Sequence, residues 1–120
     1  FGFDQLICSN SSVDVYNPKT IMASMGSFLR VNVLYTDLNT FLSSHQDYTI
    51  IGTSINGNSI YKHKFKTPSI IILGSESHGI STEMSAFTNE NISIPGKGYA
   101  ESLNIGHSAA IILNELNKIN

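Results

Sequence analysis

Short apolar runs alternate with stretches of helical period along this 120-residue chain. Aliphatic and β-branched residues dominate the runs, and we predict strands over 5–8 (QLIC), 47–54 (DYTIIGTS), 68–74 (PSIIILG) and 91–95 (NISIP). The Asn56–Gly57 dipeptide, which lies between two of these runs, is typical of a turn.

Helix signals separate the predicted strands. Asn17 followed by Pro18 is typical of a helix start, because the first turn leaves unpaired the amide hydrogen that proline lacks. An aspartate-capped helix is predicted over 37–45, and a helix with a serine–threonine start over 81–88. The segment 103–119 places apolar residues at helical spacing: Ile105, Ala109, Ile112, Leu113 and Leu116. This alternation indicates an α/β fold, a mostly parallel sheet with helices on both faces.

Composition favours a single domain over residues 1–120. The chain is 41% hydrophobic and 13% charged, which is typical of a compact globule with one core. No apolar run approaches the roughly 20 residues that cross a membrane, and the start FGFDQLICSN lacks the pattern of a signal peptide. The lone Cys8 is interpreted as a buried thiol in a reducing compartment. These features favour the cytoplasm.

A net charge of −2 provides no overall basic surface, so any nucleic-acid partner must be argued locally. The stretch YKHKFKTP at 61–68 places Lys62, Lys64 and Lys66 at alternate positions. It is either an RNA-contacting stripe or a solvated edge strand that lysines protect from pairing. No metal site is expected, because the four histidines lack ligand spacing: His45, His63, His78 and His107.

The loop ILGSESHGIS at 71–80 carries Gly74 and Gly79 in the G-x-x-x-x-G spacing of a phosphate-binding loop. Ile80 occupies the position where that loop needs lysine, and Glu76 would repel a phosphate. No G-x-G-x-x-G dinucleotide fingerprint occurs in the chain. By itself the loop is an ordinary strand-to-helix turn rather than a phosphate site.

A second stretch, SIPGKGYAESLNIGHSAAIILNEL at 93–116, contains a strand that stops at Pro95, then a glycine-rich turn and the last helix. Local chemistry alone makes it a flexible loop with Ser102 or Asn104 as the helix cap.

Together the two stretches resemble the SpoU-type family of RNA ribose 2′-O-methyltransferases, within the SPOUT superfamily. Residues 72–80 are similar to the family's second motif, and residues 94–115 to its third, at Ile94, Pro95, Ser102, Leu103, Asn104, Ala109 and Glu115. The segment 12–31 is similar to the stretch between the first and second motifs. The resemblance covers nearly the whole chain.

The resemblance implies an α/β fold with a trefoil knot near its C-terminus, a homodimer, and S-adenosylmethionine (AdoMet) bound within the knot. It implies a structured RNA, tRNA or rRNA, as the substrate. It places AdoMet contacts at Gly74, Ile94 and Leu103, and adds Thr53.

The chemistry of the residues is compatible with this donor. Glycines such as Gly74 and Gly79 permit close backbone approach, and Ile94, Pro95 and Leu103 can supply apolar walls. A loop that carries an acidic side chain suits the cationic sulfonium of AdoMet better than it suits a phosphate.

For catalysis, the resemblance assigns supporting roles to Glu76, Ser102 and Asn104. The family's first-motif arginine, which handles the ribose hydroxyl, has no match, because the only arginine, Arg30, corresponds to another family position. We therefore expect residues 1–120 to lack the first-motif segment, and the parent protein to be the enzyme. Met22 also departs from the pattern, which often has arginine there.

Two other interpretations remain open. The domain is a non-catalytic AdoMet- or nucleotide-binding knot that dimerises or docks on RNA, or it is a generic flavodoxin-like domain. An asparagine and an arginine in first-motif spacing upstream of Phe1 would favour the enzyme.

Overall fold

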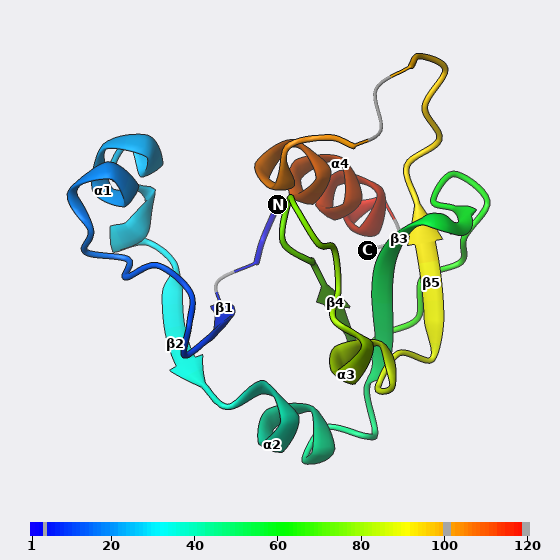
Figure 1. Ribbon diagram of the computed structural model, residues 1–120, viewed down its shortest axis with the longest axis horizontal. Helices are drawn as coiled ribbons and strands as arrows, with labels where there is room; N and C mark the ends of the chain where they lie inside the picture. The colour runs from blue at the N-terminus through cyan, green and yellow to red at the C-terminus, as the bar shows by residue number, and fades with distance from the viewer. Residues whose placement is uncertain (4, 100–101, 119–120) are drawn as a thin grey trace. The chain divides into compact units, whose positions relative to one another are not determined.

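The computed structural model describes residues 1–3, 5–99 and 102–118. The chain forms two compact units, an N-terminal unit of Gly2–Ser44 and a C-terminal unit of His45–Asn120 with which Phe1 is grouped (Figure 1). Each unit contains helices and a parallel sheet, so the prediction of an α/β fold with parallel strands is confirmed. A single domain over 1–120 stays a prediction.

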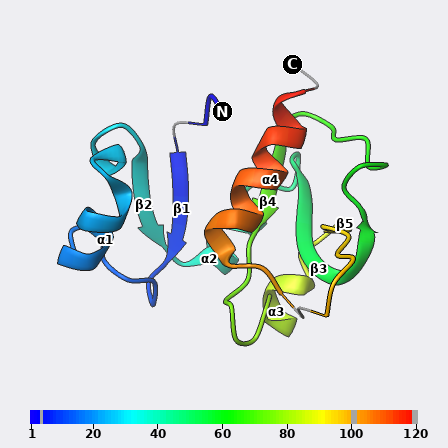
Figure 2. The same ribbon diagram turned by 90° about the horizontal axis from the view of Figure 1, so that it is seen from above.

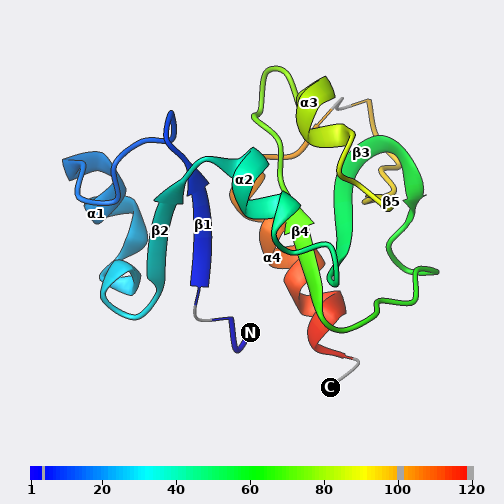
Figure 3. The ribbon, with the colours of Figure 1, turned by 90° about the horizontal axis from the view of Figure 1, so that it is seen from below.

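The sheet of the N-terminal unit consists of β1 (Gln5–Ser9) and β2 (Asn32–Thr36). The strands are parallel and in register along their whole length, and Figure 3 shows both arrowheads at the same end. β1 matches the strand predicted over 5–8. The sequence pattern does not predict β2, because this short run does not stand out from the residues before it, and pairing with β1 decides its extended form.

Local hydrogen bonds determine where α1 (Pro18–Ser24) begins. The side-chain oxygen of Asn17 accepts the amide hydrogen of Lys19 at 2.9 Å, which confirms the predicted start. The helix ends at Met25, whose φ of 50° is left-handed, and a 3₁₀ turn, η1 (Ser27–Leu29), follows.

The second helix of this unit, α2 (Leu38–Ser43), begins at the predicted aspartate cap. The carboxylate of Asp37 accepts hydrogen bonds from the Thr40 hydroxyl at 2.6 Å and the Thr40 amide at 2.8 Å. The bond from the Thr40 hydroxyl has the larger effect, and together the two bonds hold the pKa of Asp37 below its usual value. A lowered pKa means that the cap is charged at neutral pH and weakens only as the pH falls through that pKa.

Cys8 lies half-buried in β1, opposite Tyr35 of β2. Burial raises the pKa of its thiol, which disfavours the thiolate that a nucleophilic cysteine needs. The thiol is thus half-buried rather than buried as predicted, and the reducing compartment stays a prediction.

The C-terminal unit contains β3 (Thr49–Ser59), β4 (Ser69–Ile72) and β5 (Glu90–Ser93), in the order β4-β3-β5 and all parallel. A short helix, α3 (Thr82–Ser85), precedes β5, and α4 (Ile105–Asn117) closes the unit. Each of these elements overlaps a predicted one. Among the described residues, no helix is both long and apolar enough to span a membrane.

The core of this unit forms where α4 packs along the sheet (Figure 2). Ile112 and Leu116 of the helix lie four residues apart, on one face, and pack with Ile51 and Ile92 of the two neighbouring strands. All four side chains are buried, and Ile60 and Phe65 complete the cluster. The helical spacing read from the sequence thus identifies the face that α4 buries.

The turn predicted at Asn56–Gly57 is wrong, because β3 continues through these residues to Ser59. The pairing with β5 shifts register between Thr53 and Asn58, so the intervening residues bulge outward and leave Ile55 79% exposed. Glycine is needed at 57 because a Cβ there would lie 2.5 Å from the carbonyl carbon of Ile92. The glycine accommodates a neighbouring strand instead of a reversal of the chain.

The edge strand considered for 61–68 is also wrong. The segment is a loop that joins β3 to β4, and the outer strands of the described sheet are β4 and β5.

Candidate functional site

The predicted cofactor residues of the C-terminal unit gather at the carboxyl edge of its sheet. Thr53 pairs with Ile92 near the end of β5, and the Thr53 hydroxyl donates a hydrogen bond to the carbonyl of Ile72, the last residue of β4, at 3.1 Å. Gly74 follows β4 and Ile94 follows β5 directly. The structure therefore brings both loops to one edge, where parallel α/β sheets bind ligands.

The first loop is closed by its own backbone. Ser75 and Gly79 exchange two hydrogen bonds, of 3.0 and 2.8 Å, and Gly79 has a φ of 67°. A Cβ on Gly74 would overlap the backbone of Gly79 and Ile80. The close approach predicted at Gly74 is therefore made by this backbone, and an AdoMet contact at Gly74 stays a prediction.

A side-chain bridge joins this loop to α4. Oε1 of Glu76 accepts a hydrogen bond from Nδ2 of Asn104 at 2.9 Å and a longer one from the amide of Ile105 at 3.4 Å. Oδ1 of Asn104 accepts the amide hydrogen of Gly106 at 2.9 Å and so caps α4. One asparagine therefore caps the helix and also holds a carboxylate 28 residues earlier in the chain.

The remaining predicted site residues are placed less tightly. Ser102 is exposed, and within the described part of the chain no hydrogen bond joins it to Glu76. Leu103 leaves 46% of its surface exposed immediately before the cap of α4. Ile94 packs against the core, whereas Pro95 is exposed. Of the three predicted catalytic residues, the structure thus joins Glu76 and Asn104, whereas Ser102 lies two residues before Asn104 and has no described hydrogen bond to Glu76.

Sequence reasoning missed an asparagine that holds the strands behind the site. Asn89 accepts the amide hydrogen of Ile50 through its side chain at 2.7 Å and donates its own amide to the Ile50 carbonyl at 2.8 Å. These bonds fix the turn between α3 and β5 against β3. In the sequence, the signal for this role of Asn89 is its position just before the strand predicted over 91–95.

Three residues that the motifs single out lie on the surface. Arg30 ends η1 and is exposed, and Met22 is 75% exposed on α1. His78 lies at the tip of the first loop, where its Nδ1 is 2.7 Å from the Ser77 hydroxyl oxygen.

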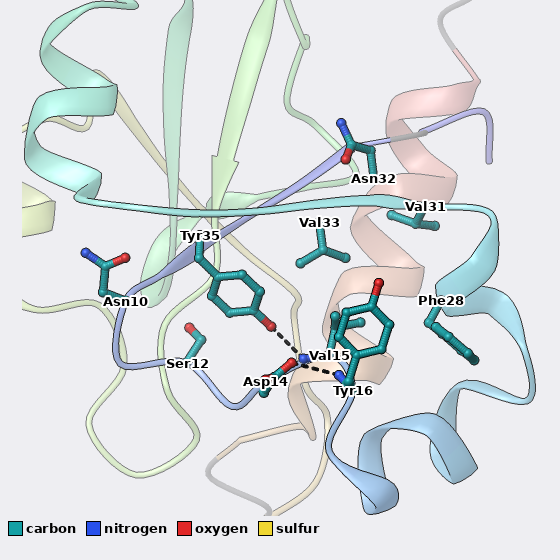
Figure 4. Close-up of a pocket in the computed structure, with 10 residues that line it drawn as sticks. All are labelled: Asn10, Ser12, Asp14, Val15, Tyr16, Phe28, Val31, Asn32, Val33 and Tyr35. Carbon is teal, nitrogen blue, oxygen red and sulfur yellow. Dashed lines mark hydrogen bonds between the residues drawn. The ribbon is translucent and has the colours of Figure 1, made fainter.

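The N-terminal unit has a separate pocket of about 550 Å³ that sequence reasoning did not find (Figure 4). Its lining combines polar groups such as Asp14 with the rings of Tyr16, Phe28 and Tyr35. The Tyr35 hydroxyl accepts the amide hydrogen of Val15 at 2.7 Å and donates to the carbonyl of Val13 at 2.8 Å. This hydroxyl therefore fixes the loop that forms one wall of the pocket.

Tyr35→Phe is expected to lower the free energy of unfolding by about 1–2 kcal/mol, because it leaves the half-buried Val15 amide without its acceptor. Chemical denaturation of the variant and the wild type measures this change. Tyr61→Phe is the matched control, since Tyr61 is 61% exposed, and it is expected to stay within about 0.5 kcal/mol of wild type. Equal effects of the two substitutions would contradict the assigned role.

The parallel sheet with two glycine-bearing loops at its carboxyl edge places the chain among α/β proteins, a class that binds ligands at this edge. Comparison with known proteins identifies the family. The chain belongs to the SpoU rRNA Methylase family, whose sequence model matches residues 1–114. The predicted family is therefore confirmed.

Individual relatives are similar over most of this chain. It is 26% identical over 118 residues to the 23S rRNA (guanosine(2553)-2'-O)-methyltransferase RlmP of Bacillus subtilis. The matched region covers 96% of this chain and 48% of RlmP. It is 33% identical over 97 residues to an uncharacterized tRNA/rRNA methyltransferase of Mycolicibacterium smegmatis. That match covers 78% of this chain and 31% of the relative. The chain thus spans about half the length, or less, of these curated relatives.

Solved structures agree with this assignment. A proposed TrmH-family RNA methyltransferase from Porphyromonas gingivalis is 31% identical, with a TM-score of 0.85 over 95% of this chain and 48% of that one. The SpoU methyltransferase AviRb from Streptomyces viridochromogenes, solved in complex with AdoMet, is 26% identical, with a TM-score of 0.81. The match covers 92% of this chain and 47% of AviRb.

Proposed function

We propose that the protein transfers a methyl group from AdoMet to the ribose 2′-hydroxyl of a structured RNA, either tRNA or rRNA. The observation that carries the proposal is the bridge from Glu76 to Asn104, which links the two family motifs at the carboxyl edge of the sheet. The names of relatives support it, since RlmP acts on 23S rRNA and AviRb was solved with AdoMet.

The residues at this edge fit AdoMet. Among the described residues, no atom lies within 4 Å of a Cβ added at Gly79, Gly96 or Gly98, so these positions leave room for a ligand. Ile94 and Leu103, which flank Gly96 and Gly98 in the sequence, offer apolar surface. When bound, AdoMet supplies an electrophilic methyl group on a sulfonium cation, and the Glu76 carboxylate is the complementary charge in the first loop.

The chain's own groups position the reactants in this proposal. Asn104 and Glu76 hold the first loop against the start of α4, so that the cofactor walls keep one geometry. Ser102, two residues before the cap, is exposed where it can donate to the ribose. The resemblance assigns the handling of the 2′-hydroxyl to the family's first-motif arginine, a role that Arg30 does not fill.

The trefoil knot, the homodimer and the cytoplasmic location implied by the resemblance and the composition are part of this proposal. Exposed apolar side chains near the site, Leu103 (46%) and Ile105 (40%), are consistent with cover by a second copy of the chain. Sedimentation of the full-length natural protein measures whether it dimerises.

Calorimetric titration with AdoMet tests the proposal, with ATP and FMN as control ligands. The wild type is expected to bind AdoMet saturably and neither control. Leu103→Arg is expected to weaken binding at least tenfold, because the new guanidinium fills the apolar wall and repels the sulfonium. Leu29→Arg is the matched control, since Leu29 is an exposed leucine of the N-terminal unit.

The outcomes separate the candidate functions. Binding of AdoMet with transfer of a labelled methyl group to RNA by the full-length natural protein supports the enzyme. Binding without transfer assigns the non-catalytic module. Unchanged affinity in Leu103→Arg removes Leu103 from the cofactor site, and selective binding of FMN would restore the flavodoxin-like alternative.

A further inference from the structure

The loop that joins β3 to β4, drawn in green in Figure 1, has two distinct sides. His63 and Phe65 point inward. Phe65 is 7% exposed and belongs to the core. The side chain of His63 is 8% exposed and packs edge-on against Phe65, with 4.6 Å between the ring centroids. Lys62, Lys64 and Lys66 alternate with them and are exposed. The alternation read from the sequence is therefore real, although the segment is a loop rather than a strand.

Positive charge is concentrated in this loop. Three of the chain's seven lysine and arginine residues fall within the five positions 62–66, and the stretch 61–68 contains no acidic residue. The chain as a whole has a net charge of −2, so this loop is a local exception. A local excess of this kind attracts polyanions even when the net charge does not.

Among the described residues, the carboxylate that the ion pairs place at this loop is Glu90, which already has partners. Glu90 lies at the start of β5, with Oε2 3.4 Å from His63 Nε2 and Oε1 3.4 Å from Lys66 Nζ. Lys62 and Lys64 make no ion pair within the described residues. Their charges are therefore available to an external anion.

The lysines border a hollow that suits a phosphate chain. Its volume is about 390 Å³, and the side chains of Asn58 and Ser59 add uncharged hydrogen-bonding groups. Tyr61, next to the first lysine, is 61% exposed and presents an aromatic face of the kind on which unpaired bases stack. Ammonium groups for phosphates beside a ring for a base favour RNA over an acidic protein segment.

We propose that this basic hollow, formed by Asn58, Ser59, His63, Glu90 and the three lysines, binds the phosphate backbone of the RNA substrate. The inference rests on the proposed function for its partner. It assigns RNA contact to a loop that lies outside both family motifs. Lys62 and Lys64 supply the charges that meet phosphate, and Glu90, through His63 and Lys66, holds the loop in place.

The test compares two double variants of the full-length natural protein that carry the same change in charge. Lys62→Gln with Lys64→Gln removes both unpaired lysines of the hollow. Lys19→Gln with Lys118→Gln removes a lysine of α1 and one that pairs with Glu115 at the end of α4. Fluorescence anisotropy measures binding of a labelled RNA hairpin with a single-stranded extension, over about 50 to 200 mM salt.

The hollow variant is expected to bind the hairpin about tenfold more weakly near physiological salt, with a salt slope smaller by about 2. The control is expected to stay within about twofold of wild type. Equal losses in both variants, unchanged binding in the hollow variant, or no binding of the hairpin by wild type would each overturn the proposal. Displacement of the hairpin by polyglutamate at equal charge would assign the surface to an acidic protein instead.

AdoMet titration of the same proteins separates this inference from the proposed function. Both double variants are expected to keep wild-type AdoMet affinity, because the hollow lies outside the predicted cofactor residues. RNA binding that only the hollow variant weakens, without any AdoMet binding, would refute the methyltransferase and support the hollow. If the wild type binds AdoMet and transfers the methyl group, and the hollow variant binds RNA as tightly as the wild type, the hollow alone would be refuted.

Discussion

Gly74→Ala is expected to abolish AdoMet binding and to lower the free energy of unfolding by about 3 kcal/mol. The added methyl group would overlap the backbone of Gly79 and Ile80, which cannot move as a flexible side chain could. The loop must therefore open, and its two backbone hydrogen bonds between Ser75 and Gly79 are lost with it. Calorimetry with AdoMet and chemical denaturation measure the two effects.

The matched control for stability is Gly96→Ala, because no atom of the part of the chain that the structure describes lies within 4 Å of a Cβ added at Gly96, and its φ is not left-handed. Its free energy of unfolding is expected to stay within about 0.5 kcal/mol of wild type. If Gly74→Ala folded as stably as this control, the packing of Gly74 against the Gly79–Ile80 peptide would be refuted.

Glu76→Ala is expected to slow methyl transfer by the full-length natural protein about a hundredfold, with a much smaller change in AdoMet affinity. The carboxylate holds the first loop to Asn104 and to the start of α4, and small displacements of positioned groups cost large factors in rate. Single-turnover rates and calorimetry separate the two quantities. A loss of affinity as large as the loss of rate would make Glu76 a binding residue.

Asn104→Ser isolates the bridge from the helix cap. Serine still accepts the amide hydrogen that Asn104 accepts from Gly106, but it lacks the amide donor that reaches Glu76. The Ser variant is expected to keep near wild-type stability and to lose rate, and in combination with Glu76→Ala it should add little further loss. Fully additive losses would show that the two side chains act independently.

Local signals located most of the helices and strands. Asn17 and Asp37 mark helix starts because each accepts an amide hydrogen two or three residues later, a contact that needs no distant partner. The helical spacing of Ile112 and Leu116 likewise identifies the buried face of α4 before its partner strands are known.

The errors share one cause, which is pairing between distant segments. Asn56–Gly57 looks like a turn, yet Gly57 lies against the backbone of Ile92 in another strand, 35 residues later in the chain. β2 owes its extended form to β1. The lysines of 61–68 alternate as in a strand, but His63 and Phe65 turn inward in a loop.

The sequence by itself determined the family, the residues of both motifs and the caps of α1, α2 and α3, since these depend on residue types at short spacing. Only the tertiary structure decided that Glu76 meets Asn104 and that the lysines of the 61–68 loop border a hollow with Glu90. The physical reason is distance along the chain. Contacts between residues about 25 or more positions apart form only when the sheet brings strand ends together, and no local pattern encodes that meeting.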